Sequence, residues 1–510
     1  MHDKTKNQNL SKVALKNSFY SFSAGLIVKL GGLVFTILIA RLLLPELFGI
    51  YALALSIITI FMIFTDLGIN ETFLRYFSEA LGRKNKNKAR SYFRYLLKIK
   101  SLLIFLAIFV LLVLSRFLSY NLYNNPLLFY PLLFSCLFII AESFRNFIGG
   151  IFLATKNLKP IPFLELFHQI TKILFSILAI LIFSTEFKVA GLFLAFALSG
   201  FAHLILLFLI SYKKDKTLFR GKTVSIDKKR ISRFLKFMGI ASLSLVFFLS
   251  IDILMLGLFV DAEYIAYYRV ALSLVLTIAA LSSLSGVLLP IFTQINKERF
   301  KRGFRKTFRY IMLIAIPATI GILFIGKYLI FTIYGKEYLL AVSSLYALSL
   351  LVITMPLTTL YTIIFESKEK TKILAKSVSI SLVINIILNY VLIKYLLQFS
   401  QEYVIIGVGI ATVISRLIYL GILSFNAKHK LNLAVKGIGL RSPIFATIMM
   451  GLGLFLFNHF VDMNLFFGII EIILGAGIYL GVLIAIKGVT KEDWDLLKSL
   501  IMKEPKRDNF

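Results

Sequence analysis

The sequence has almost no cysteine and few acidic residues. Among its 510 residues there is one cysteine, Cys136, so no disulfide can form within the chain. Aspartate and glutamate total 25 against 57 lysines and arginines, and the formal net charge is +32. The five histidines show no metal-ligand spacing, and no phosphate-cradling GxxxxGKS motif occurs. The sequence therefore gives no reason to expect a cofactor, a metal or ATP hydrolysis.

The hydrophobic content places the chain in a membrane. Hydrophobic residues make up 59% of the sequence, compared with roughly 45–50% in soluble domains. Apolar runs alternate with short, often basic connections, and a run of about 20 helical residues matches the hydrocarbon thickness of a bilayer. We expect an all-α polytopic membrane protein without a cleavable signal peptide, because the first apolar run is too long for a signal core.

About fourteen transmembrane helices are predicted, in two parallel six-helix pseudo-repeats followed by two C-terminal helices. The predicted spans are 18–40, 46–67, 97–117, 127–153, 163–183, 189–211, 235–260, 267–294, 310–333, 339–365, 373–397, 403–425, 443–461 and 465–486. The corresponding segments are a cytoplasmic tail (1–17), an N-terminal lobe (18–211), a basic cytoplasmic linker (212–234), a C-terminal lobe (235–425), a cytoplasmic loop (426–442), an appended helix pair (443–486) and a cytoplasmic tail (487–510).

The basic residues set the expected orientation. With the N-terminus in the cytoplasm, 46 of the 57 lysines and arginines fall in cytoplasmic segments, as the positive-inside rule requires. Six fall outside: Arg41, Arg116, Lys188, Lys327, Lys336 and Lys394. The other five lie within spans or at their edges: Lys29, Arg145, Lys172, Arg269 and Arg416. The excess positive charge is explained by anionic lipid headgroups at the inner leaflet, so nucleic acid is not expected as a partner.

An internal similarity supports the two repeats. YALALSII at 51–58 aligns without gaps on YRVALSLV at 268–275, which places Glu46 on Glu263. Each segment begins the second predicted span of its half, which runs from outside to inside. Parallel repeats of this kind are a transporter architecture with the binding site between the halves.

Two stretches resemble a known family, the polysaccharide-biosynthesis flippases. This family belongs to the superfamily of multidrug and toxic-compound extrusion transporters and lipid II flippases. The matching elements are Ala40-Arg41-Leu42, Pro45-Glu46, Phe48-Gly49-Ile50-Tyr51, Asp66-Leu67-Gly68 and Arg75, and later Asp252 with Tyr267-Tyr268-Arg269-Val270-Ala271. The resemblance implies a flippase of the cell membrane that moves a polyprenyl (pyro)phosphate-linked oligosaccharide from the inner to the outer leaflet. Glycosyltransferases and a polymerase of the same pathway are the expected protein partners of a monomeric chain.

Such a cargo needs a wet, cationic path for its head while its tail stays in lipid. Four cations are candidates for substrate binding: Lys29, Lys172, Arg269 and Arg416. In the resemblance, Arg269 takes a place like that of a cationic residue in the lipid II flippase. Lys29 and Arg269 could instead snorkel to an interface, and Lys29 could instead pair with Asp252 or Asp66.

The remaining charged and polar residues in the spans have both a structural and a functional interpretation. Lys172 shares a helical face with Glu165, His168 and Gln169, which lines a path or joins helices. Asp252, Glu165 and Asp66 are candidates for ion coupling or for lining the cavity, although the Asp-Leu-Gly turn gives Asp66 a structural role. Glu142 with Arg145 is expected to form an intrahelical pair, and Asn385 with Asn389 to join helices.

Enzymatic activity is not expected. No long outer loop could house the chemistry of a glycan polymerase or ligase, and no nucleotide-sugar domain is visible. A multidrug-type antiporter of small molecules or cations is the leading alternative. The excess of cationic over acidic residues near the midplane favours an anionic cargo instead.

Overall fold

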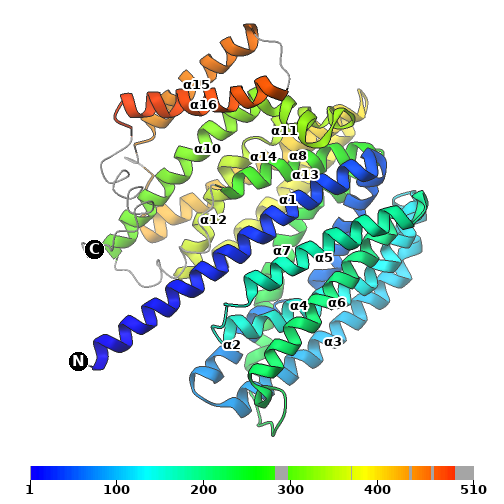
Figure 1. Cartoon of the computed structure of the whole chain (residues 1–510), viewed down its shortest axis with the longest axis vertical. Helices are drawn as coiled ribbons and strands as arrows, with labels where there is room; N and C mark the ends of the chain where they lie inside the picture. Colours follow the sequence, from blue (N-terminus) through cyan, green and yellow to red (C-terminus); the bar gives the residue numbers. More distant parts are fainter. Residues whose placement is uncertain (1, 282–296, 369, 436–438, 461–464, 489–510) are drawn as a thin grey trace.

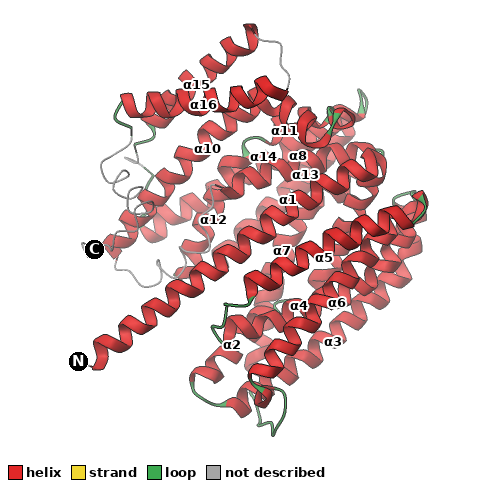
Figure 2. Cartoon of the chain, in the orientation of Figure 1, coloured by secondary structure: helices red, strands yellow, loops and turns green. Residues whose placement is uncertain are grey.

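The computed structural model describes residues 2–281, 297–368, 370–435, 439–460 and 465–488. Within these ranges the secondary structure is helical and contains no strand (Figure 2). The all-α prediction is confirmed.

The first two predicted spans form one continuous element with a sharp break. Helix α1 (His2–Phe64) is interrupted at Leu44, whose φ of 62° is not helical, directly before Pro45. Contacts at the two ends of α1 show that its legs run in opposite directions. Asn17, near the start, bonds to Lys156 just after the fourth predicted span, and Thr65, just after the end, bonds to Ser143 within that span. The spans predicted at 18–40 and 46–67 are thus both present.

The rest of the N-terminal lobe follows the predicted spans closely. It contains α2 (Ile69–Gly82), α3 (Lys86–Arg116) with a π-helical extension (Phe117–Leu122), α4 (Phe129–Ala154), α5 (Ile161–Ile182) and α6 (Lys188–Lys214). Helix α2 was not predicted: it is a short amphipathic helix in the 68–96 connection, and its apolar face is buried against α3 and α4.

The C-terminal lobe repeats this order. It contains α7 (Lys228–Leu256), α8 (Ala262–Leu281), α10 (Lys297–Tyr334), α11 (Ala341–Leu348), α12 (Leu351–Ser367), α13 (Thr371–Leu396) and α14 (Gln401–Leu431), and the appended pair is α15 (Arg441–Phe460) and α16 (Leu465–Ala485). The end of the span predicted at 267–294 lies outside the described residues.

Eleven described helices are long and apolar enough to cross a membrane, or twelve if α11 and α12, bent by 43°, form one span. Counting the two legs of α1 separately adds one span. Helix α7, with a shorter apolar stretch at Val246–Leu256, takes the place of the remaining predicted span.

Helix packing is the same in the two lobes. The first leg of α1 packs on α5, α5 on α6, and α6 on α4. In the C-terminal lobe α7 packs on α13, α13 on α14, and α14 on α11 and α12. Figure 1 shows α1 crossing the middle of the molecule, with α3 to α6 on one side and α10, α15 and α16 on the other. This repeated packing agrees with two parallel pseudo-repeats and an added pair.

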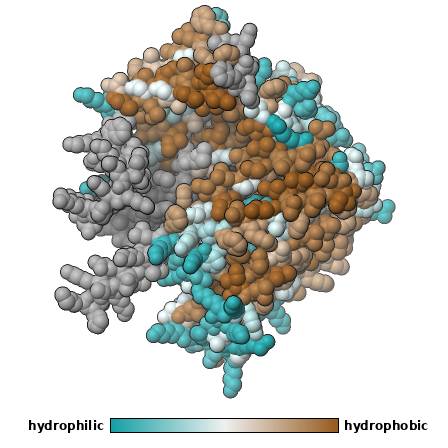
Figure 3. Space-filling view, in the orientation of Figure 1, coloured by the Kyte–Doolittle hydropathy of each residue, from teal (hydrophilic) through white to brown (hydrophobic). Residues whose placement is uncertain are grey.

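The outer surface is apolar, as a lipid-facing surface must be. Large hydrophobic side chains such as Leu181 (73% exposed) and Ile182 (75% exposed) point away from the helices. Figure 3 shows a broad apolar belt over the helices, with polar residues at the lower edge and further polar residues at the upper right. In water such a surface would aggregate, whereas in a bilayer it is solvated by acyl chains.

The predicted orientation can be tested with single cysteines in a Cys136→Ser background. Ser225 and Lys297 lie in basic segments expected in the cytoplasm, and the exposed Glu186 lies in the short connection expected outside. In intact cells a membrane-impermeant thiol reagent should label Glu186→Cys but neither Ser225→Cys nor Lys297→Cys, and permeabilisation should expose all three. Labelling of Ser225→Cys or Lys297→Cys in intact cells would reverse the orientation.

Candidate functional site

An open cavity of about 340 Å³ lies between the first leg of α1 and α8, where the two lobes face each other. Among the described residues that line it, two are cations, Lys29 and Arg269, and none is a carboxylate. Hydroxyl groups of Thr36, Ser273 and Thr277 add polarity to the same wall. The sequence placed Lys29 and Arg269 on different spans of different lobes, and the fold brings them into one cavity.

Neither cation has an acidic partner among the described residues. Lys29 is exposed and Arg269 partly buried, and no ion pair joins either side chain to the described parts of the chain. Of the two carboxylates considered as partners of Lys29, that of Asp66 lies 2.8 Å from Lys100. Asp252 is likewise occupied by other groups. Two uncompensated positive charges in a cavity with apolar walls favour an anion.

The Asp66 turn is built as the sequence suggested, but its partner was missed. Leu67 (φ 41°) and Gly68 (φ 81°) both adopt left-handed conformations, which turn the chain into α2. The Asp66 carboxylate accepts the Asn70 backbone N–H at 3.3 Å and the Lys100 ammonium at 2.8 Å. Lys100 is 1% exposed, so this ion pair fixes α3 against the turn.

The carboxylate of Asp66 also acts on the neighbouring helix. Burial, and next the charge of Asp66, raise the pKa of Glu71 in the first turn of α2. The ion pair of Lys100 with Asp66 is therefore a local structural contact that stabilises this end of the N-terminal lobe.

A second charged cluster lies inside the N-terminal lobe. Arg145 donates from Nε to Glu142 at 2.7 Å, makes a second bond to the same carboxylate, and reaches Glu165 on α5 at 3.4 Å. The intrahelical pair is confirmed, and the pair extends to a neighbouring helix. Lys172 lies near it, with its ammonium 4.5 Å from the ring centroid of Phe35 on α1.

Two histidines complete this cluster. His168 on α5 and His203 on α6 have ring centroids 5.0 Å apart, and His203 is 1% exposed. Gln169, which follows His168 on α5, packs closely on α1. A Cβ added at Gly31 of α1 would lie 2.7 Å from the Cγ of Gln169. Of the polar face predicted on span five, His168 and Gln169 are therefore buried in protein, and Glu165 and Lys172 are partly buried.

A third polar group holds the C-terminal lobe together. Asp252 accepts hydrogen bonds from Tyr268 (2.9 Å), Thr412 (2.8 Å) and Asn389 (2.8 Å). Asn385 donates to Ser415 on α14 at 3.2 Å. The two asparagines therefore join helices, as predicted.

Arg416 lies beside this network. It is 5% exposed, and its guanidinium carbon is 3.8 Å from the ring centroid of Phe248. The four predicted cations thus occupy three separate places. Lys29 and Arg269 share the cavity, Lys172 is in the N-terminal cluster, and Arg416 is in the C-terminal core.

The lobes are also joined at the end where α1 breaks. Arg41 donates from Nε to the Ile333 carbonyl at 2.8 Å and also bonds to the Thr332 carbonyl, both in the last turn of α10. Tyr338 donates to the Ala40 carbonyl at 2.7 Å. The motif arginine that the sequence assigned only to the outer side is therefore a cross-lobe contact.

One glycine allows an even closer approach at this junction. A Cβ at Gly49 would lie 1.7 Å from the carbonyl oxygen of Ala262, at the start of α8. No side chain fits there unless the lobes separate.

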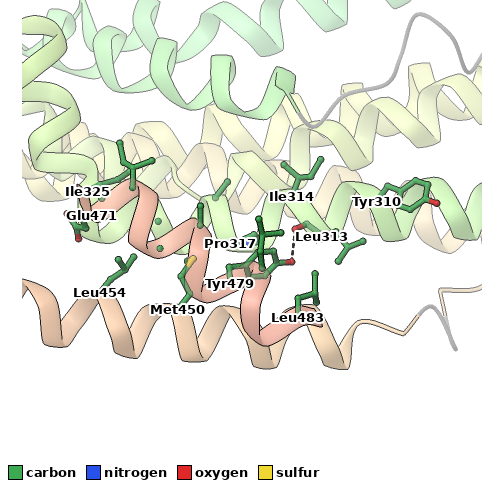
Figure 4. Close-up of a pocket in the computed structure, with 16 residues that line it drawn as sticks. Tyr310, Leu313, Ile314, Pro317, Ile325, Met450, Leu454, Glu471, Tyr479 and Leu483 are labelled. Atoms are coloured by element: carbon green, nitrogen blue, oxygen red, sulfur yellow. Dashed lines mark hydrogen bonds between the residues drawn. The ribbon is translucent and has the colours of Figure 1, made fainter. Parts of the chain in front are cut away.

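A separate apolar groove of about 700 Å³ lies between α10, α15 and α16 (Figure 4). Its walls are almost entirely hydrocarbon, and Tyr479 closes one side by donating to the Leu313 carbonyl at 2.7 Å. Glu471 also lines it and accepts from Asn458 at 2.9 Å. The appended pair therefore forms a long apolar surface next to the C-terminal lobe, which sequence reasoning did not predict.

Solved transporter structures share this fold. The lipid II flippase MurJ in its inward closed conformation aligns over 91% of this chain and 97% of its own, with a TM-score of 0.68 and 18% identity. An inward-facing multidrug resistance MATE family transporter of the MOP superfamily aligns over 82% and 95%, with a TM-score of 0.58 and 15% identity. A MOP superfamily transporter from Pyrococcus furiosus aligns over 83% and 97%, with a TM-score of 0.58 and 13% identity. The chain therefore shares the fold of these transporters.

The sequence identifies the family to which the chain belongs. The sequence model of the polysaccharide biosynthesis protein family matches residues 14–296, more than half of the chain, and the chain belongs to that family. No curated protein sequence matches it. The family resemblance seen in the first helices is confirmed, and the protein is a multi-pass membrane protein of this family.

Stability measurements should separate the paired lysine from the unpaired one. Lys100→Ala would leave the Asp66 carboxylate without its partner and should lower the free energy of unfolding by about 3 kcal/mol. Lys29→Ala removes a side chain without an ion pair and should change it by less than about 0.5 kcal/mol. Unfolding of the two purified variants in detergent tests this contrast, which equal losses would refute.

Proposed function

We propose that this protein is a flippase that moves a polyprenyl (pyro)phosphate-linked oligosaccharide from the inner to the outer leaflet of the cell membrane. The observation that carries the proposal is the cavity between the lobes with two cations, Lys29 and Arg269, that have no acidic partner in the described part of the chain. A phosphate or diphosphate head supplies the missing negative charge. The sugar is polar and fits the same wet space.

The groove of α10, α15 and α16 suits the lipid tail. A polyprenyl chain is long and apolar, and the groove offers hydrocarbon walls open to the side of the molecule. The head in the cavity and the tail along the groove would keep each part of the cargo in a solvent that it prefers.

Transport proceeds by alternating access. The contacts of Arg41, Tyr338 and Gly49 close the lobes at the end expected to face outside, so the cavity would receive its cargo from the other side. Opening this junction while the opposite end closes would present the head outward. An inside-negative potential favours outward movement of an anion by about 2.3 kcal/mol per charge per 100 mV.

Coupling to H⁺ or Na⁺ would add a driving force. Asp252 and Glu165 are the candidate carriers, since each is a carboxylate held inside one lobe by groups from neighbouring helices. Both termini are cytoplasmic in this proposal, and the chain acts as a monomer beside the glycosyltransferases and polymerase of its pathway. Anionic lipids bind the basic cytoplasmic face.

A multidrug-type antiporter is the second candidate, and the MATE transporters that share the fold favour it. The lining of the cavity argues against it, because cationic drugs need acidic groups, whereas the charged residues of the described lining are Lys29 and Arg269. Catalysis of glycan transfer is the weaker alternative. The proposed reaction makes and breaks no bond.

Reconstituted transport tests the cargo and the cavity together. Purified protein in liposomes should expose a lipid-linked oligosaccharide on the opposite leaflet. Lys29→Ala should slow this by at least about tenfold by removing a charged hydrogen bond to the head, and Lys29→Arg should retain most of the rate. Arg116→Ala, an exposed change on α3, is the matched control.

Three results would contradict the proposal. Wild-type transport by a folded Lys29→Ala protein would remove the cavity from the path. Lengthening or transfer of the glycan would establish an enzyme. Efflux of small lipophilic cations without handling of the lipid-linked substrate would establish the antiporter.

The outer junction gives a second test, with cysteine placed at Ser273 in the cavity wall. Gly49→Ala puts a methyl group onto the Ala262 carbonyl and should hold the junction open, so labelling of Ser273→Cys from outside should increase. Gly25→Ala, where a Cβ meets nothing within 4 Å, should leave labelling unchanged. Tyr338→Phe removes one hydrogen bond of about 1 kcal/mol and should shift labelling about fivefold in the same direction. Unchanged labelling in both junction variants would show that these contacts do not close the cavity.

A further inference from the structure

His203 is the most poorly satisfied polar side chain of the N-terminal cluster. It is 1% exposed, and neither Nδ1 nor Nε2 has a hydrogen-bond partner among the described residues. A neutral imidazole carries one donor and one acceptor, and leaving both unpaired in a buried place is costly. We therefore expect a group close to His203 that binds one of its ring nitrogens.

Two side chains that could bind a metal ion lie close to His203. One ligand atom each from Glu165, His168 and His203 lie within 4.8 Å of one another. Glu165 and His168 are one helical turn apart on α5, and His203 comes from the neighbouring α6. Two imidazoles and a carboxylate, with water as the fourth ligand, form a common tetrahedral Zn²⁺ set.

The charges nearby leave Glu165 available. Arg145 makes its two closest contacts with Glu142, and its 3.4 Å contact with Glu165 is the longest of the three. A metal ion would therefore replace only this weaker contact. Two positive charges oppose a metal ion here, Arg145 and Lys172. Arg145 is paired with Glu142, whereas Lys172 lies over the Phe35 ring without a described hydrogen bond.

We propose that Glu165, His168 and His203 form a binding site for Zn²⁺ or a similar transition-metal ion that joins α5 to α6 within the N-terminal lobe. Imidazole nitrogen selects such ions over Na⁺, Mg²⁺ and Ca²⁺, which prefer oxygen. The site is distinct from the cavity of Lys29 and Arg269, and a metal ion held there would leave Asp252 as the candidate carrier of a coupling ion.

Co²⁺ is the probe, because tetrahedral Co²⁺ with nitrogen and oxygen ligands gives intense visible absorption. The purified full-length protein in detergent should bind one Co²⁺ with these bands, and Zn²⁺ should displace it. His203→Ala should weaken binding at least about 100-fold, since it removes a direct ligand. Lys172→Met removes one opposing charge and should tighten binding several-fold, which a structural hydrogen-bond cluster would not produce.

Controls keep the test decisive. His459→Ala removes an exposed histidine elsewhere and should leave the spectrum unchanged. Glu165→Gln keeps the size of the side chain and should also lose the bands, which covers the case that His203→Ala fails to fold. Absence of Co²⁺ binding by the wild-type protein, or equal binding by His203→Ala or Glu165→Gln, would overturn the proposal.

Discussion

The cost of a charge in a medium of low dielectric constant governs this structure. A lysine or arginine within a span must pair, stack on an aromatic ring, or face water. Lys100 pairs with Asp66, Arg145 with Glu142, and Arg416 stacks on Phe248. Lys29 and Arg269 have no such compensation in the described chain and lie in an open cavity. Of the three ways to compensate a charge, facing water is the one left to these two side chains, and this is why the proposed binding region is placed there.

The same constraint explains how much the sequence could predict. Hydrocarbon thickness sets the length of each span, so the helices could be predicted from apolar runs, and the break at Leu44 follows from Pro45. Pairs within one helix, such as Glu142 with Arg145, follow from spacing. The Lys100 contact with Asp66 joins residues on different elements, and no local pattern encodes it.

The grouping of the predicted cations illustrates the same limit. Depth along a helix could be estimated from the sequence, but rotation about the helix axis could not, and rotation decides between the cavity and the core. Lys172 and Lys29 have similar depths, yet Lys172 faces Phe35 within the N-terminal lobe while Lys29 faces the opposite lobe. The proposed metal site could not be predicted for a related reason, because His203 meets His168 only through packing of α5 on α6.

The contacts at the break of α1 suit the reversible closure that the proposed transport requires. Their donors, Arg41 and Tyr338, bind backbone carbonyls instead of carboxylates. The last carbonyls of α10 carry the negative end of the helix dipole, so they attract Arg41 without placing a second full charge at the interface. When the junction opens, water can replace these acceptors, and no buried acidic group is left unpaired. Each bond contributes about 1–3 kcal/mol, which is comparable to the differential binding that a charged cargo supplies, so the cargo can shift the balance between the closed and open states.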